Sequence, residues 1–167
     1  LTNAPSSAQL WLTHTPVPAP FTPLPNLELE EAHATLGRAI YTPTYVPVGY
    51  ALTRLSASRG NVNSLYNLVV DGECCRYLWI AQLRNGGSIS QFGVGDVPIV
   101  DVTIGDLPGL WIENAPLGVD SGSDSGTRPT NLLTWRDGDN VFWIQSFSTI
   151  DAQRLPLDEM LKIAESL

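Results

Sequence analysis

Residues 39–50 read AIYTPTYVPVGY, and this stretch separates two kinds of sequence pattern. Pro43 and Pro47 lack backbone donors and bias the residues that precede them toward extended geometry. Gly49 allows a turn that a side chain would strain. A helix-like pattern comes before this stretch and strand-like alternation comes after it, so we interpret it as a hinge. It carries no reactive group, and its role is architectural.

Residues 26–37, NLELEEAHATLG, predict a short helix just before the hinge. Asn26 can cap its first turn, and Gly37 suits its exit. Its apolar residues share one face at helical spacing; they are Leu29, Ala32 and Leu36. His33 is most simply a surface or boundary residue of this helix, because no nearby carboxylate or cysteine pattern accompanies it.

Residues 1–26 contain six of the thirteen prolines and predict an extended arm or linker in front of a single domain at residues 27–167. Trp11 and Phe21 are large aromatics that a free linker rarely carries, so we first interpret them as docking the arm onto the domain. A proline-rich recognition peptide is the functional alternative, and it would need an aromatic-lined partner. The sequence leaves open whether the arm is ordered.

After the hinge, apolar residues alternate with polar ones at the period of a β-strand. The predicted strands are Tyr50–Ser58, Leu65–Val70, Cys74–Leu83, Ile99–Ile104, Leu110–Glu113, Asn131–Arg136 and Val141–Phe147. Asp71-Gly72 and Asp137-Gly138 are hairpin signals, and consecutive hairpins predict an antiparallel meander. The strand Cys74–Leu83 has apolar residues on both sides, which predicts a central strand covered on both faces.

The chain closes with LPLDEMLKIAESL, whose apolar stripe predicts an amphipathic helix. The stripe consists of Leu157, Met160, Leu161, Ala164 and Leu167. Such a helix must bury its stripe, and the sheet is the only large partner available. The predicted fold class is therefore α+β: an antiparallel meander sheet of six or seven strands, a short N-terminal helix, and a C-terminal helix packed on the sheet.

The chain has 167 residues, a net charge of −8 and a single lysine, Lys162. A phosphate backbone is bound by clustered Lys and Arg, so the composition argues against nucleic acid and against an anionic membrane surface. No run of eighteen apolar residues exists, so no transmembrane segment is predicted. Because the chain begins at Leu1 without an initiator Met, we expect a trimmed or processed product whose natural N-terminal context is unseen.

Cys74 and Cys75 are adjacent in the sequence. Neighbouring Cα atoms lie about 3.8 Å apart across a trans peptide, which is shorter than the usual disulfide span. On a strand their side chains would also point to opposite faces. We therefore predict that the two cysteines are not bonded to each other, and that one thiol is buried while the other lies nearer solvent.

Two long polar segments, Arg84–Asp96 and Asn114–Pro129, predict surface loops between the strands. The second contains Asp120 and Asp124 but lacks the alternating acidic ligands and terminal Glu of a calcium loop. Zinc needs about four converging ligands, and no Cys or His partner has a suitable spacing. We expect no metal or other cofactor, and we expect any partner contact to involve one of these loops or the N-terminal arm.

The sequence contains no recognisable catalytic constellation. A Ser nucleophile needs a base, and the two histidines are His14 in the arm and His33 on the first predicted helix. No nucleophile elbow, metalloprotease motif or P-loop is present. Paired carboxylates for glycoside cleavage stay open as an alternative. We predict that the chain is not an enzyme.

Four segments together resemble a known family: LELEEAHA, PTYVPVGYAL, LLTWRDGDNVFWI and LDEMLKIAESL. The family is the bacterial domain of unknown function family 4367, and the resemblance runs from about Leu27 to Leu167. Val48, the cysteine pair and the proline-rich arm depart from the family pattern. The resemblance implies an extracytoplasmic C-terminal domain of a membrane-anchored, anti-sigma-factor-like or lipoprotein-sorting-like protein, and it supplies no catalytic residues.

These observations favour a non-catalytic binding or sensory domain at the bacterial cell surface or in the periplasm. The alternative is a carrier domain that shelters a lipid or a lipidated protein in a groove between the sheet and a helix. The partner is then an envelope protein or a small apolar ligand, and the sequence names no contacting residues.

Overall fold

The computed structural model describes residues 30–34, 39–57, 60–84, 97–118 and 127–167. Its regular elements are β1 (Ala51–Ala57), β2 (Asn61–Val70), β3 (Glu73–Arg84), β4 (Ile99–Ile104), β5 (Leu107–Gly118), β6 (Thr127–Asp137), β7 (Asn140–Ser148) and α2 (Leu157–Glu165). Residues 30–34 are also helical and fall within the predicted helix at 26–37. The rest of that helix and the predicted arm lie outside the described residues. The sheet and the helices confirm the predicted α+β class.

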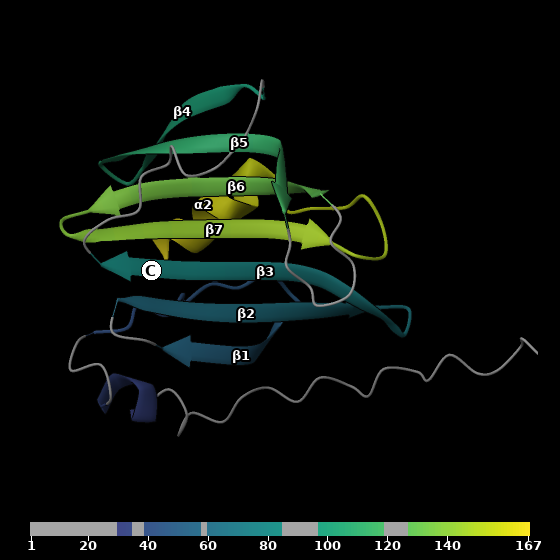
Figure 1. Ribbon diagram of the computed structural model, residues 1–167, viewed down its shortest axis with the longest axis horizontal. Helices are drawn as coiled ribbons and strands as arrows, with labels where there is room; N and C mark the ends of the chain where they lie inside the picture. The colour runs from purple at the N-terminus through teal and green to yellow at the C-terminus, as the bar shows by residue number, and fades with distance from the viewer. Residues whose placement is uncertain (1–29, 35–38, 58–59, 85–96, 119–126) are drawn as a thin grey trace, which may run out of the picture.

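All seven strands form one sheet, and every neighbouring pair is antiparallel. The strand order is β1-β2-β3-β7-β6-β5-β4 (Figure 1). β1 to β3 form one meander, and β4 to β7 form a second that starts at the far edge and returns until β7 pairs with β3. The predicted meander is therefore present in two parts. As a result β3 and β7, which are distant in the sequence, are interior neighbours.

β5 and β6 are longer than predicted, and their pairing continues through Pro116 opposite Pro129. The predicted loop Asn114–Pro129 is therefore wrong at both ends, while residues 119–126 lie outside the described part. Proline cannot donate to a ladder, which is why the sequence pattern indicated a loop. Both prolines are tolerated because they lie beyond the last pairs that β5 makes with β4 and that β6 makes with β7. The other predicted loop is Arg84–Asp96. Arg84 is the last residue of β3, and the rest of this segment lies outside the described residues.

Two-residue turns close the predicted hairpins. Asp71 and Gly72 join β2 to β3 with φ angles of 51° and 81°, the left-handed geometry that a tight hairpin turn requires. In the β6–β7 hairpin the turn residues are Gly138 and Asp139, one position later than the predicted pair that began at Asp137. Both hairpins are thus confirmed, and the second is shifted by one residue.

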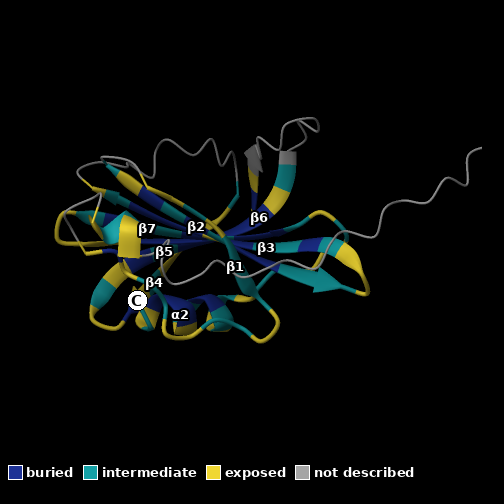
Figure 2. Ribbon diagram, turned by 90° about the horizontal axis from the view of Figure 1, so that it is seen from below, coloured by how far each residue is buried: buried dark blue, intermediate teal, exposed yellow. Residues whose placement is uncertain are grey.

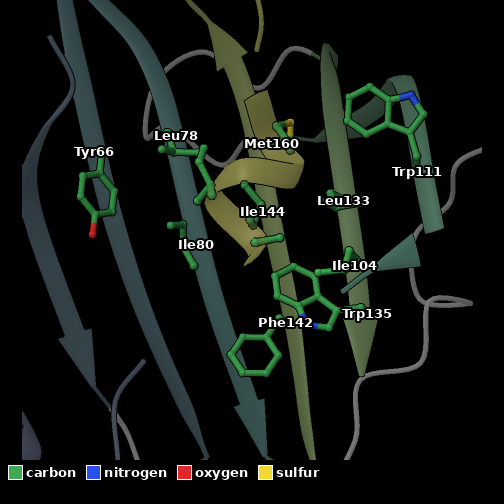
Figure 3. Close-up of a cluster of buried hydrophobic side chains, with 12 residues drawn as sticks. Tyr66, Leu78, Ile80, Ile104, Trp111, Leu133, Trp135, Phe142, Ile144 and Met160 are labelled. Atoms are coloured by element: carbon green, nitrogen blue, oxygen red, sulfur yellow. The ribbon is translucent and has the colours of Figure 1, made fainter. Parts of the chain in front are cut away.

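α2 packs on one face of the sheet and closes the main hydrophobic core (Figures 2 and 3). Met160 and Ile163 are fully buried, and Ala164 is nearly so. The sheet contributes alternate residues of its strands to this core: Tyr66, Leu78, Ile80, Ile104, Trp111, Leu133, Trp135, Phe142 and Ile144. The predicted docking of the helix is confirmed. Ile163, which the predicted stripe omitted, is one of its central contacts.

The predicted hinge ties the end of the chain to the middle of the sheet. The Thr44 backbone N–H donates to the Ser166 carbonyl at 3.1 Å. The Tyr41 N–H donates to the buried side chain of Gln82 on β3 at 2.9 Å. Gly49 has a φ of 90°, a conformation that favours glycine at this turn. The hinge therefore fixes α2 relative to the sheet through hydrogen bonds as well as through the core.

Cys74 and Cys75 form a disulfide with each other at the start of β3, so the prediction that they are unbonded is wrong. The prediction assumed a trans peptide, but the peptide bond between them is cis, and their Cα atoms are 3.1 Å apart. The Thr149 hydroxyl accepts a hydrogen bond from the Cys75 N–H at 3.1 Å. Cys75 is fully buried and Cys74 is half-buried. The hydrogen bond to Thr149 thus joins the start of β3 to the segment that follows β7.

Candidate functional site

The pairing register assigns the strand residues to two faces of the sheet. Residues directly opposite each other on antiparallel neighbours share a face, and successive residues alternate. α2 covers the face that contains Leu78, Ile80 and Ile144. We call the opposite face the outer face; it contains Trp79, which pairs with Gln145 of β7. Figure 2 shows α2 on one side of the sheet, away from this face.

Five uncharged residues form what we call the tryptophan platform on the outer face of β2, β3 and β7: Asn63, Trp79, Ala81, Trp143 and Gln145. Trp79 lies opposite Gln145 and Ala81 lies opposite Trp143, so the two tryptophans are diagonal neighbours, about 7 Å apart at their backbones. Ala81 is small and nearly buried, and it leaves a shallow notch of about 10 Å³ beside the two indoles.

Trp79 is 37% exposed although β3 has a paired strand on each side. The prediction that this strand is interior is confirmed, but the prediction that both its faces are covered is wrong at Trp79. Neighbouring strands supply hydrogen-bond partners in the plane of the sheet, whereas covering a face requires a second layer. An exposed indole on an interior strand is an informative feature, because large aromatic side chains usually bury their area in a core.

The polar groups of the platform are only partly used within the protein. The Trp79 Nε1–H donates to Asn63 Oδ1 at 3.2 Å, which orients the indole ring. In the part of the chain that the structure describes, neither the amide nitrogen of Asn63 nor the side chain of Gln145 has a hydrogen-bond partner. Each amide can donate and the Gln145 oxygen can accept. The platform therefore combines an exposed ring with free hydrogen-bonding groups beside it.

Two further aromatic residues lie on the same face toward the disulfide: Tyr77, which is half-buried, and Phe147, which is buried. The two residues are opposite each other in the register, and their rings stack with centroids 4.8 Å apart. The Cys74 Sγ lies 3.6 Å from the Tyr77 hydroxyl. The disulfide thus contacts Tyr77 close to the β2–β3 turn.

A hollow of about 700 Å³ adjoins the platform at the β4–β5 hairpin, a size that is typical of small-molecule pockets. The register places these lining residues on the outer face: Asp101, Thr103, Leu110, Thr134, Arg136 and Val141. Thr134 lies directly opposite Trp143 of the platform. Its hydroxyl is buried without a hydrogen-bond partner among the described residues. The hollow carries both signs of charge, from Asp101 and Arg136.

A second, smaller apolar cluster closes part of the outer face. Ile112, Ala115 and Leu132 are fully buried there, and Val97 and Trp143 pack against them. This cluster covers β5 and β6, and Trp143 forms its border with the platform. Over β2, β3 and β7 the outer face is exposed at Trp79 and half-buried at Asn63, Trp143 and Gln145, while Ala81 and Phe147 are buried.

The perturbed pKa values among the described residues are explained by burial and by structural hydrogen bonds. Burial raises the pKa of Tyr50 and of Tyr66 to about 12. The hydrogen bond from Arg76 lowers the pKa of Asp151 to about 2. Side-chain hydrogen bonds also raise the pKa values of Tyr45, Arg76 and Lys162 and lower that of Glu159. Every one of these shifts moves a pKa away from neutrality.

The sequence predicts no catalytic, cofactor-binding or metal-binding residue, and His14, Asp120 and Asp124 lie outside the described residues. His33 is half-buried, and its Nδ1 accepts a hydrogen bond from the Ile40 N–H at 3.4 Å. Within the described ranges, no group of three or more His, Cys, Asp or Glu residues is placed to hold a metal ion. Nor does any helix of those ranges have the length and apolar character needed to cross a membrane.

Sequence reasoning missed the platform because its residues come from both meanders. The local signal was present: Trp79 alternates with the core residues Leu78 and Ile80, and Trp143 alternates with Phe142 and Ile144. Placing the two tryptophans side by side requires the pairing of β3 with β7, which no short motif specifies.

Comparisons with known proteins leave the chain without a match: no family model, no curated protein and no solved structure matches it.

Proposed function

We propose that this chain is a non-catalytic binding or sensory domain that works outside the cytoplasm as part of a membrane-anchored bacterial protein, as the resemblance to the domain of unknown function family implies. The observation that carries the proposal is the tryptophan platform. Leaving part of an indole in water forgoes some of the stability that its full burial would supply, and partly exposed aromatics on rigid elements are typical of binding surfaces. β2, β3 and β7 are paired along their length and provide that rigidity.

The titratable groups support a role without turnover. A general acid or base works best with a pKa near the operating pH. Among the described residues, each group with a perturbed pKa is shifted toward a single protonation state at neutral pH, as the buried phenols of Tyr50 and Tyr66 illustrate. These shifts are those of structural contacts.

The disulfide supports a location outside the cytoplasm. Disulfides persist in oxidising compartments, whereas cytosolic thiols are kept reduced. The Cys74–Cys75 pair is structural in its surroundings, since Cys75 is fully buried and Thr149 hydrogen-bonds its backbone. An envelope location would maintain this bond.

The interface between α2 and the sheet favours a binding surface over the carrier alternative. A carrier would shelter a lipid in a groove between sheet and helix. Met160, labelled in Figure 3, fills this interface together with Ile163, and both pack against the sheet core without exposure to solvent. A lipid there would have to displace these side chains, whereas a ligand on the outer face would displace only water.

A capture experiment tests the proposal. Immobilised wild-type chain, a Trp79→Ala/Gln145→Ala double variant and a Val48→Ala control are incubated with envelope extract, after circular dichroism has verified each fold. Val48 is 99% exposed in the hinge, whose neighbouring residues Val46 and Tyr50 pack against the core closed by α2. The control substitution therefore removes an exposed apolar side chain that is not part of the platform. We expect a component that the wild type and the control retain and the double variant loses.

Retention of the same components by all three proteins would overturn the proposal, as would hydrolysis of a substrate by the pure chain in a broad activity screen. The expectation that the segments Arg84–Asp96 and Asn114–Pro129 or the arm also contact the partner stays a prediction. Shortening these segments in the same assay tests it separately.

A further inference from the structure

We propose that the ligand of the tryptophan platform is a neutral polysaccharide, with one sugar ring stacked on Trp79 and its hydroxyls hydrogen-bonded to Asn63 and Gln145. This inference rests on the proposed function and names the ligand class of the same site.

The chemistry of a sugar ring matches the arrangement of the platform. A pyranose presents C–H groups on one face and hydroxyls around its edge, so it pairs best with a flat apolar ring that has donors and acceptors beside it. Trp79 supplies the ring, 37% exposed and oriented by its hydrogen bond to Asn63. The amide nitrogen of Asn63 and the whole amide of Gln145 lie beside it without partners among the described residues.

The charge distribution selects a neutral polymer over an acidic one. All five platform residues are uncharged. Along the cross-strand row that contains Trp79, the nearest charged residue is Arg54 of β1, and Leu65 lies between the two. Arg54 and Arg136, which is a diagonal neighbour of Trp143 on the outer face, flank the platform. These two cations cannot offset the net charge of −8 on the chain, which repels a polyanion. A lipid headgroup or phosphate would likewise lack a cationic partner in the platform.

The shape of the platform selects a polymer over a small enclosed ligand or an acyl chain. The notch beside Trp79 and Trp143 has a volume of about 10 Å³, which holds about one water-sized group. An acyl chain or a free monosaccharide would leave most of its surface in water there. A polysaccharide can bury more of its surface, because neighbouring sugars can continue along the outer face toward the half-buried ring of Tyr77.

Affinity gel electrophoresis of the pure chain tests this inference. The gels contain a β-glucan, an α-glucan, a mannan, a galactan or a xylan as neutral probes, and alginate as the acidic probe. We expect retardation by at least one neutral polymer and none by alginate. Trp79→Ala should weaken that binding about tenfold, Trp79→Phe should restore part of it, and Val48→Ala should behave like the wild type. Gln145→Leu, which removes the amide and keeps the size, should also weaken binding.

Three results would overturn the inference: no retardation by any neutral probe, stronger retardation by alginate, or equal retardation of the wild type and Trp79→Ala. The capture experiment distinguishes the possible failures. If the Trp79→Ala/Gln145→Ala variant still loses an envelope component, the platform is the binding site and only the ligand class is wrong. If that variant retains every component as well, the proposed function fails too.

Discussion

Among the carboxylates that the structure describes, Asp151 has the most strongly lowered pKa. Arg76 donates two hydrogen bonds to one of its oxygens, at 2.6 and 3.0 Å, and the Gln153 N–H donates to the other. These contacts, with the Ser148 hydroxyl nearby, hold the pKa of Asp151 at about 2, below its ordinary value of 3.8. The ionised carboxylate joins β3 to the segment that follows β7.

The first prediction is a pH dependence of stability that originates at Asp151. Because its pKa is lower in the folded chain, the ionised form stabilises the fold above about pH 4, and this contribution is lost as the pH falls toward 2. Urea unfolding at pH 6 and pH 2 should therefore show a stability difference between wild type and Asp151→Asn that shrinks at the lower pH. Asp106→Asn, an exposed site without an ion pair among the described residues, is the matched control. A constant difference for Asp151→Asn would contradict the role assigned to this ion pair.

The second prediction concerns Cys74 and Cys75. Since they are bonded to each other, alkylation of the unfolded chain without reductant should add no mass, and alkylation after reduction should add two groups. Mass spectrometry of the intact chain makes the measurement. Alkylation without reductant, or a disulfide-linked dimer on a non-reducing gel, would show that the vicinal bond is absent.

At the scale of the element, α2 is held by both its apolar stripe and its polar end. Met160, Ile163 and Ala164 supply the buried stripe. The Ser166 carbonyl, just past the end of the helix, accepts a hydrogen bond from the Thr44 N–H of the hinge. The hinge and the helix therefore stabilise each other against the same face of the sheet.

The third prediction is that Met160→Asp destabilises the chain by roughly 3 kcal/mol or more, because it places an unpaired charge in a fully buried position. Leu161→Asp should cost less, since Leu161 is only partly buried at the margin of the core. Glu165→Asp, on the exposed side of α2, should leave stability nearly unchanged. Urea unfolding of the three variants decides the order, and an unchanged midpoint for Met160→Asp would mean that α2 does not dock.

The elements were largely predictable because periodicity is a local property. β4 has the predicted bounds Ile99–Ile104, and α2 begins at Leu157 as its stripe indicates. Two features were not predictable in this way. Pro116 and Pro129 pair with each other beyond the last residues that β5 pairs with β4 and that β6 pairs with β7. Neither proline therefore has to donate a hydrogen bond to a second neighbouring strand, a context that local sequence does not reveal. The prediction for the cysteine pair was wrong because it assumed the usual trans peptide, and the local sequence does not reveal the cis bond.

At the scale of the whole molecule, the sheet has one face devoted to the core and one that exposes Trp79 among half-buried residues of β2, β3 and β7. The first face was predictable from the amphipathic stripe of α2. The arrangement of the second face was not, because it depends on the second meander returning to place Trp143 and Gln145 beside Trp79 and Ala81. The candidate site is thus a product of tertiary pairing, and the sequence alone supplied only its separate halves.

The fourth prediction tests the central claim, that the outer face is the binding surface. The chain has five tryptophans, of which Trp79 and Trp143 lie on the platform while Trp111 and Trp135 are buried in the core under α2. Their indole N–H signals in a ¹H–¹⁵N spectrum of labelled chain can be assigned by single Trp→Phe variants. The spectrum is then recorded before and after the addition of unlabelled envelope extract. We predict that the signals of Trp79 and Trp143 shift or broaden while those of Trp111 and Trp135 stay in place. Unchanged signals from Trp79 and Trp143, or changes confined to the two core tryptophans, would contradict the claim.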